Sequence, residues 1–210
     1  MSDLIIIGAG DFAREVAWLV NRINDSCHVW NLLGFVDDFK VGQMVDGYPV
    51  LGSVNWLSTY TKKIHVVCAI GNSSARKKIW ETLSSNQNIS LATLLDPNSV
   101  IGPTCSIGEG CIICAGAILT INASLGTNCI VNLNCTVGHD AILDDYCTLH
   151  PNVNISGRVH VGECCVIGTG SQIIQGLEIC AASILGAGSV VSKTISTPGT
   201  YVGIPARRVK

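Results

Sequence analysis

The chain has 210 residues, with 13 lysines and arginines against 15 aspartates and glutamates, and therefore a formal net charge of −2. This balance excludes a strongly basic nucleic-acid-binding protein and an acidic tail. Only 13% of the residues are charged and 48% are hydrophobic, whereas a typical soluble domain carries about 25% charged residues. So little charge indicates subunit contacts, or an architecture with little side-chain surface per residue.

The longest uncharged stretch, residues 110–139, is not predicted to span a membrane. A spanning helix needs about 20 mostly apolar residues. Here the apolar run 111–119 is followed at once by Thr120, Asn122 and further polar side chains. We therefore expect no membrane span in this chain.

The start of the chain does not resemble an export signal, because its apolar run covers only residues 4–7 and follows Asp3. The 11 cysteines are too few for a disulfide scaffold in a chain of this length. We expect a cytoplasmic protein with reduced thiols.

Residues 1–95 alternate strand-like and helix-like segments, which predicts a small α/β domain around a parallel sheet. In chain order the pattern predicts a strand at 4–7, a Gly8-Ala9-Gly10 turn, a helix at 11–23, strands at 29–36 and 64–70, and a helix at 73–84.

From about residue 99 onward the chain repeats every six residues. Every sixth position from Ile101 to Val191 is aliphatic, without a slip in register. The position two residues earlier carries a mostly small side chain and holds six of the 11 cysteines. These cysteines are expected to act as small buried hydrophobes.

A strict hexapeptide period predicts a parallel β-helix in which three hexapeptides form one triangular coil. The repeats suffice for just over five coils, or a prism about 25 Å tall at ~4.8 Å per strand. Since the aliphatic side chains fill its interior, function must lie on the outer surface or between subunits. The second domain is expected to cover residues 96–210.

Several motifs identify a family. They are glycine after the aliphatic position (Gly102, Gly108, Gly126, Gly138, Gly162, Gly168, Gly186), Ile7-Gly8-Ala9-Gly10, Gly34-Phe35-Val36-Asp37-Asp38, Ala69-Ile70-Gly71-Asn72, Gly138-His139-Asp140 and the ending Tyr201-Val202-Gly203-Ile204-Pro205-Ala206-Arg207. Together they resemble the hexapeptide-repeat sugar acetyltransferases of the sialic acid O-acetyltransferase and bacillosamine N-acetyltransferase type.

The resemblance implies a Rossmann-like nucleotide-sugar-binding domain at 1–95 and a left-handed β-helix at 96–210. It also implies acetyl-CoA as co-substrate, a nucleotide-sugar as acceptor, no metal, and homotrimers with active sites between prisms. In this family the nucleotide would lie against Gly10, Asp11 and Phe12, with Asp37 and Asp38 after the second strand and Gly71 after a later one.

A dinucleotide-dependent dehydrogenase is the alternative for the N-terminal turn. The fingerprint is weak, because Ala13 occupies the third glycine position and Asp37 lies 27 residues after Gly10 instead of the usual ~20. A purely structural turn is the other alternative.

His139 is the expected general base. An amine on a sugar is mostly protonated at neutral pH and must lose a proton to attack a thioester, which suits histidine. Asp140 follows directly and is expected to orient the imidazole, with Asp144 and Asp145 as alternative carboxylates. Direct transfer is preferred over an acyl-enzyme.

The acetyl-CoA site is inferred from the family alone. Bacillosamine-type enzymes have a second histidine where this chain has Thr148, and His150 lies at a different place in its repeat. The correspondence assigns the coenzyme groove to the following positions: Thr148, Gly157, Thr169, Ala187 and Arg207.

The sequence therefore predicts an acetyl-CoA-dependent N-acetyltransferase acting on the amine of a nucleotide-linked 4-amino-4,6-dideoxy sugar. The alternatives are O-acetylation of sialic acid or another sugar hydroxyl, and a non-catalytic nucleotide-sugar-binding β-helix protein. A zinc site at Cys111 and Cys114 is disfavoured because no second such pair exists.

Overall fold

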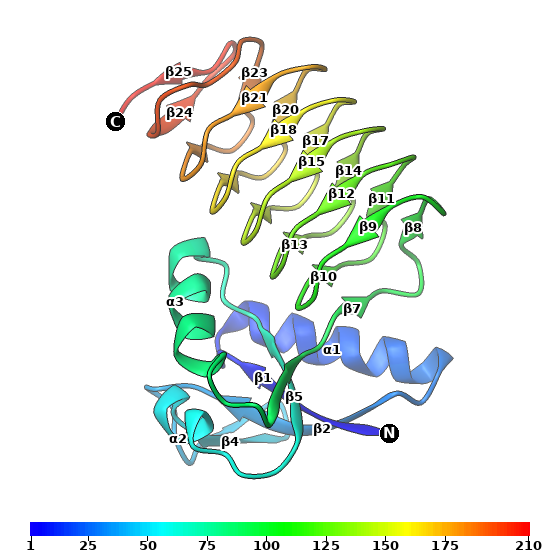
Figure 1. Ribbon diagram of the computed structural model, residues 1–210, viewed down its shortest axis with the longest axis vertical. Helices are drawn as coiled ribbons and strands as arrows, with labels where there is room; N and C mark the ends of the chain where they lie inside the picture. The colour runs from blue at the N-terminus through cyan, green and yellow to red at the C-terminus, as the bar shows by residue number, and fades with distance from the viewer. The chain divides into compact units, whose positions relative to one another are not determined.

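The computed structural model describes residues 1–210, which form two compact units, Met1–Pro97 and Asn98–Lys210. The sequence-based boundary after residue 95 falls two residues before this division. None of the helices combines the length and apolar character that a membrane span requires. The colour change in Figure 1 follows the chain from the α/β unit into the repeating coils.

The first unit is an α/β unit. Its elements are β1 (Ser2–Ile7), α1 (Asp11–Ser26), β2 (Trp30–Val36), β3 (Met44–Val45), β4 (Tyr48–Gly52), α2 (Val54–Ser58), β5 (Ile64–Cys68), α3 (Ser73–Leu83), β6 (Ile89–Leu91) and β7 (Leu94–Leu95). Six strands form one sheet in the order β3-β4-β2-β1-β5-β6. All neighbours are parallel except the β3–β4 hairpin.

The central strand β1 explains why the first apolar run is continuous. Its residues Leu4 to Ile7 are at most 2% exposed, as expected for a parallel strand covered on both faces. The predicted strands and helices are confirmed. The hairpin of β3 and β4, the short helix α2 and the strand β6 were not predicted.

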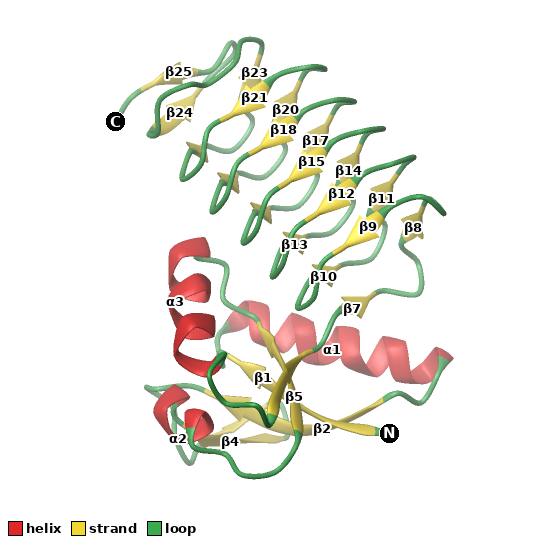
Figure 2. Cartoon of the chain, viewed as in Figure 1, coloured by secondary structure: helices red, strands yellow, loops and turns green.

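The second unit is the expected left-handed parallel β-helix. Its elements are β8 (Val100–Ile101), β9 (Ser106–Ile107), β10 (Ile112–Ile113), β11 (Ile118–Leu119), β12 (Ser124–Leu125), β13 (Ile130–Val131), β14 (Thr136–Val137), β15 (Ile142–Leu143), β16 (Thr148–Leu149), β17 (Asn154–Ile155), β18 (His160–Val161), β19 (Val166–Ile167), β20 (Gln172–Ile173), β21 (Glu178–Ile179), β22 (Ile184–Leu185), β23 (Val190–Val191), β24 (Thr200–Val202) and β25 (Arg207–Arg208). Yellow strands recur at the same place in each coil of Figure 2.

The strands build three faces. The first face is β8-β11-β14-β17-β20-β23, the second is β9-β12-β15-β18-β21, and the third is β10-β13-β16-β19-β22-β24 with β25 antiparallel to β24. Pairing always joins a residue to the one 18 positions later, as Thr136 to Asn154. Residues 18 apart therefore stack in columns along the prism.

Each face meets the next at an edge of four residues. We call the edge that leads from the first face to the second the first edge; it includes residues 120–123, 138–141 and 156–159. The third edge leads from the third face back to the first and includes 150–153, 168–171 and 186–189.

One residue of nearly every edge segment has a left-handed backbone. Positive φ recurs at every sixth position from Gly110 to Gly188, through Asn122 (φ +58), Asp140 (φ +58) and Asn152 (φ +60). Glycine, asparagine and aspartate tolerate this conformation best. The sequence analysis read the aliphatic column and missed this second signal of the same period.

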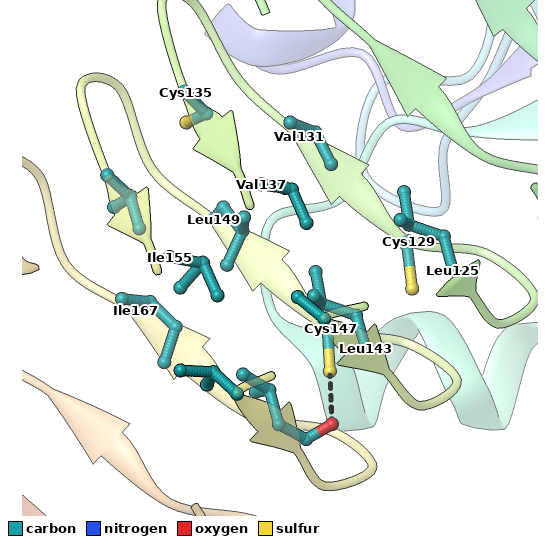
Figure 3. Close-up of a cluster of buried hydrophobic side chains, with 14 of the residues drawn as sticks. Leu125, Cys129, Val131, Cys135, Val137, Leu143, Cys147, Leu149, Ile155 and Ile167 are labelled. Carbon is teal, nitrogen blue, oxygen red and sulfur yellow. Dashed lines mark hydrogen bonds between the residues drawn. The ribbon is translucent and has the colours of Figure 1, made fainter. Parts of the chain in front are cut away.

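The interior is filled by the predicted aliphatic column and its small neighbours. Figure 3 shows Val137, Leu149 and Ile155 directed into the core, and each is at most 1% exposed. The buried thiols do more than fill space. For example, Cys129 donates to the carbonyl of Asp144 at 3.1 Å, and the dashed line in Figure 3 marks a hydrogen bond of the Cys147 thiol.

Burial predicts selective thiol chemistry. All 11 cysteines are free thiols, Cys27 is exposed, and Cys111, Cys129 and Cys147 are fully buried. Iodoacetamide at pH 8 is expected to label Cys27 within minutes and to leave these three unlabelled, because only an accessible thiolate reacts. Peptide mass spectrometry measures the labelling, and a urea-unfolded sample is the control. Equal labelling of Cys27 and Cys129 in the folded protein would contradict the structure.

Candidate active site

His139 lies on the first edge, between β14 and β15, where the chain turns outward from the core. The inward Val137 fixes the register of this coil. The His139 side chain is 52% exposed, so it is held at the surface with access to ligands.

Asp140 orients the imidazole. The Nδ1 atom of His139 lies 2.8 Å from Oδ2 of Asp140. A carboxylate only accepts hydrogen bonds, so Nδ1 carries the hydrogen and Nε2 carries the lone pair. The structure thus gives Asp140 the contact expected of it. The alternative carboxylates are engaged elsewhere, since Asp144 faces His160 and Asp145 accepts from the amide of Thr127.

Asp140 is held in its ionised form. The hydrogen bond from His139, and then the one from the side chain of Asn122, keep the pKa of Asp140 below its usual range. Arg158, one coil further on, adds a weaker favourable charge. The carboxylate is therefore negative throughout the neutral range and stabilises a proton received by the imidazole.

Gly157 makes room for the imidazole. It lies 18 residues after His139 in the same column and is buried although it sits on an edge. A Cβ on Gly157 would lie 2.6 Å from Cε1 and 2.8 Å from Cδ2 of His139. Its φ is not in the left-handed region, so only the ring excludes a side chain here. The family correspondence predicted a coenzyme contact for Gly157, and the observed contact is with His139.

A second histidine and carboxylate pair lies on the second face. Nε2 of His160 is 3.0 Å from both carboxylate oxygens of Asp144. The neighbouring pocket, about 360 Å³, is lined by Asp144, Asp145 and Glu163. Three carboxylates repel the phosphates of a coenzyme. This pair is therefore a poorer candidate than His139 and Asp140.

The other residues predicted for acetyl-CoA do not lie beside His139. Thr169 and Ala187 stack one coil apart on the third edge, and both are exposed. Thr148 lies on the third face and is only 2% exposed, so it offers a ligand no surface and we leave it out of the proposed site. Burial lowers the pKa of the half-buried His150, which is also on the third edge.

The end of the prism carries a basic pocket that the sequence analysis found only in part. Its volume is about 320 Å³, and its lining includes Lys193, Thr194, Arg207 and Arg208. Lys193 lies on the first edge, in the column of His139 and three coils beyond it. That separation is about 14 Å at one strand spacing per coil. The 54-residue interval from 139 to 193, three times 18, was the sequence signal for this relation.

The predicted nucleotide residues of the first unit lie around the start of α1. Gly8 has φ +99, and Gly10 precedes the helix without any side-chain cap. The first amides of α1 are thus available to an anion, which a helix N-terminus favours. Asp11 and Phe12 begin the helix. A Cβ on Gly10 would meet nothing within 4 Å, so this turn is open.

The acidic pair after β2 supports this turn. Asp37 accepts hydrogen bonds from the amides of Ala9 and Phe39, each at 2.9 Å. Asp38 accepts from the amide of Val54 at 2.8 Å. Both carboxylates therefore hold the main chain, a role that the sequence analysis did not anticipate. Gly71 also has open space at its Cβ position.

Comparisons with known proteins agree with this architecture. The family model for the PglD N-terminal domain matches residues 3–83, and the model for the bacterial transferase hexapeptide (six repeats) matches residues 92–120. A curated relative, GDP-perosamine N-acetyltransferase of Escherichia coli O157:H7, is 33% identical over 98% of this chain and 95% of its own length.

Solved structures resemble the whole chain. The acetyltransferase domain of PglB from Neisseria gonorrhoeae FA1090 in complex with acetyl coenzyme A superposes with a TM-score of 0.91 at 30% identity, covering 99% of this chain and 98% of that one. A histidine-to-asparagine mutant of perosamine N-acetyltransferase from Caulobacter crescentus, in complex with CoA and GDP-perosamine, gives 0.89 at 28% identity, covering 100% and 98%.

The contact of Gly157 with the imidazole is testable. Gly157→Ala is expected to displace the ring of His139 and to lower kcat about 10-fold to 100-fold, the cost of a small misplacement of a reacting group. In a His139→Ala background the same substitution should cost nothing further, because the ring is absent. Steady-state kinetics of the four proteins measures both effects. An equal loss in both backgrounds would instead assign Gly157 a separate role.

Proposed function

The chain belongs to the hexapeptide-repeat N-acetyltransferases of the bacillosamine and perosamine type, and from that premise we propose that its acceptor is a GDP-linked 4-amino-4,6-dideoxy sugar. Membership makes the chain an acetyl-CoA-dependent acetyltransferase that uses a histidine base. The observation that carries the finer proposal is the exposed His139, held by Asp140, with Nε2 open above Gly157.

His139 is the proposed base. Its Nε2 takes a proton as the sugar amine attacks the thioester carbonyl of acetyl-CoA and forms the new C–N bond. The tetrahedral intermediate then collapses, the C–S bond breaks, and the coenzyme thiolate receives the proton from the imidazolium. Asp140 stabilises the imidazolium between these two steps. No acyl-enzyme is needed, because the nearest thiols, Cys135 and Cys147, are buried in the core.

Acetyl-CoA is proposed to lie along the first edge. Its thioester would be at His139 and its phosphates in the pocket of Lys193, Arg207 and Arg208, where cations favour them. The pantetheine arm would cover the coils between. This placement keeps Arg207 from the predicted coenzyme residues and adds Lys193 to them.

The nucleotide is proposed to bind at the start of α1. The open amides after Gly10 suit a diphosphate, and Asp37 fixes the turn that presents them. Gly71 leaves space beside the end of β5. The base and the sugar are assigned as in the relatives that act on GDP-perosamine.

A homotrimer is proposed because apolar side chains surround the site. Ile121 precedes His139 in the same column and is 49% exposed, and Val100, Ile118 and Ile142 on the adjoining faces are 39–60% exposed. Exposed apolar patches mark protein interfaces. In a trimer, the first edge of one protomer would lie near the third edge of another, which brings Thr169 and Ala187 to the coenzyme.

The cytoplasm is the proposed compartment. Eleven free thiols fit a reducing environment, and acetyl-CoA and nucleotide-sugars are available there.

The reaction is tested by thiol release from acetyl-CoA. Wild-type protein is expected to turn over with GDP-perosamine in preference to UDP- and dTDP-linked 4-amino sugars, and not with free sialic acid as a hydroxyl acceptor. His139→Ala should lower kcat by about 10²–10⁴ and leave the Kd of acetyl-CoA unchanged. Turnover only with sialic acid would overturn the acceptor, and wild-type turnover by His139→Ala would overturn the base.

The coenzyme path is tested at its far end. Lys193→Gln is expected to raise the KM of acetyl-CoA about five- to tenfold, because it removes one charge-assisted contact to phosphate. With S-acetylpantetheine, which has no phosphate, the variant and the wild type should react alike. The same deficit with both donors would place the phosphates elsewhere.

A further inference from the structure

We infer that Asn122 is a positioning residue of the acetyl transfer, which holds Asp140 in the orientation that directs the His139 imidazole. The inference rests on the proposed role of His139. It starts from the column of the first edge that contains Thr104, Asn122, Asp140 and Arg158, each 18 residues after the one before.

The contacts in this column form a continuous chain of hydrogen bonds. The side-chain Nδ2 of Asn122 donates to Oδ1 of Asp140 at 3.0 Å. The other oxygen of Asp140, Oδ2, faces Nδ1 of His139 at 2.8 Å. Each carboxylate oxygen therefore has its own partner, and rotation of the carboxylate would break both contacts.

Asn122 is itself fixed. Its amide donates to Oγ1 of Thr104 at 3.0 Å, and its backbone is left-handed with φ +58, which asparagine tolerates. A fixed amide is a better support than a mobile charged side chain, because less conformational entropy opposes the contact. The same residue type thus forms the turn and supports the carboxylate.

The charge around Asp140 is also ordered. His139 and Asn122 hold the pKa of Asp140 low, and Arg158 faces it from the next coil. Asp140 is thus flanked by a neutral donor on one side and a cation on the other. The other stacked asparagines, Asn134 and Asn152, are on the third edge, in a column without an acid.

The test uses two substitutions of Asn122 and a matched control. Asn122→Gly keeps the left-handed turn and removes the donor. Asn152→Gly makes the same change at a residue with φ +60 on the third edge. Asn122→Gly is expected to lower kcat about tenfold with little change in KM, while Asn152→Gly stays at the wild-type rate. Equal rates for the two variants would overturn the inference.

Asn122→Asp provides a pH signature that a purely structural role would not give. Two adjacent carboxylates raise the pKa of one of them, so at low pH the protonated Asp can donate to Asp140 as the amide did. The deficit in kcat should therefore shrink between pH 8.5 and pH 6, with His139, Asp140 and Arg158 as the charged groups around it. A deficit independent of pH would contradict the inference.

Nitrogen-15 spectra of the histidine rings separate this inference from the proposed function. Asn122→Gly should shift the titration of His139 and leave that of His28 unchanged, whether or not the acceptor is correctly assigned. His139→Ala, assayed in parallel, tests the base itself. If His139→Ala is inactive while Asn122→Gly shows neither the kinetic nor the spectral change, only the role of Asn122 fails.

Discussion

Each coil of the prism has to return the chain to its starting point one strand spacing further along, and this closure in 18 residues determines the rest of the second unit. It requires an aliphatic side chain inside each face and a left-handed residue at nearly every edge. Since strand pairing is parallel and in register, residues 18 apart become neighbours. Sequence separations that are multiples of 18 therefore act as direct spatial contacts.

The catalytic arrangement is built from these columns. His139 gains its space from Gly157 in its own column, and Asp140 gains its second partner from Asn122 in the next one. The edge is also where side chains turn away from the core and remain accessible. A rigid scaffold thus holds a small polar group at the surface, and such rigidity is what positioning a reacting group requires.

The sequence predicted this fold well because the period is strict and local, and because the α/β unit has long, strongly patterned strands such as β1. His139 and Asp140 were found from a motif and a chemical requirement. The contacts of Asn122 and Gly157 were not, since each depends on which residues stack, and the aliphatic column alone does not show where edges fall. Thr148 was assigned from its relatives, whereas its burial depends on tertiary structure. The roles of Asp37 and Asp38 as main-chain acceptors depended likewise on the path of the loop after β2.

The most direct test of the central claim is a crystal structure of the protein with coenzyme A and the unreacted GDP-linked 4-amino sugar. The sugar amine is expected within about 2.6–3.2 Å of Nε2 of His139, the reach of a general base, with the coenzyme sulfur beside it on the first edge. An amine bound away from the first edge, or one facing His160 on the second face, would contradict the assignment of His139 as the base.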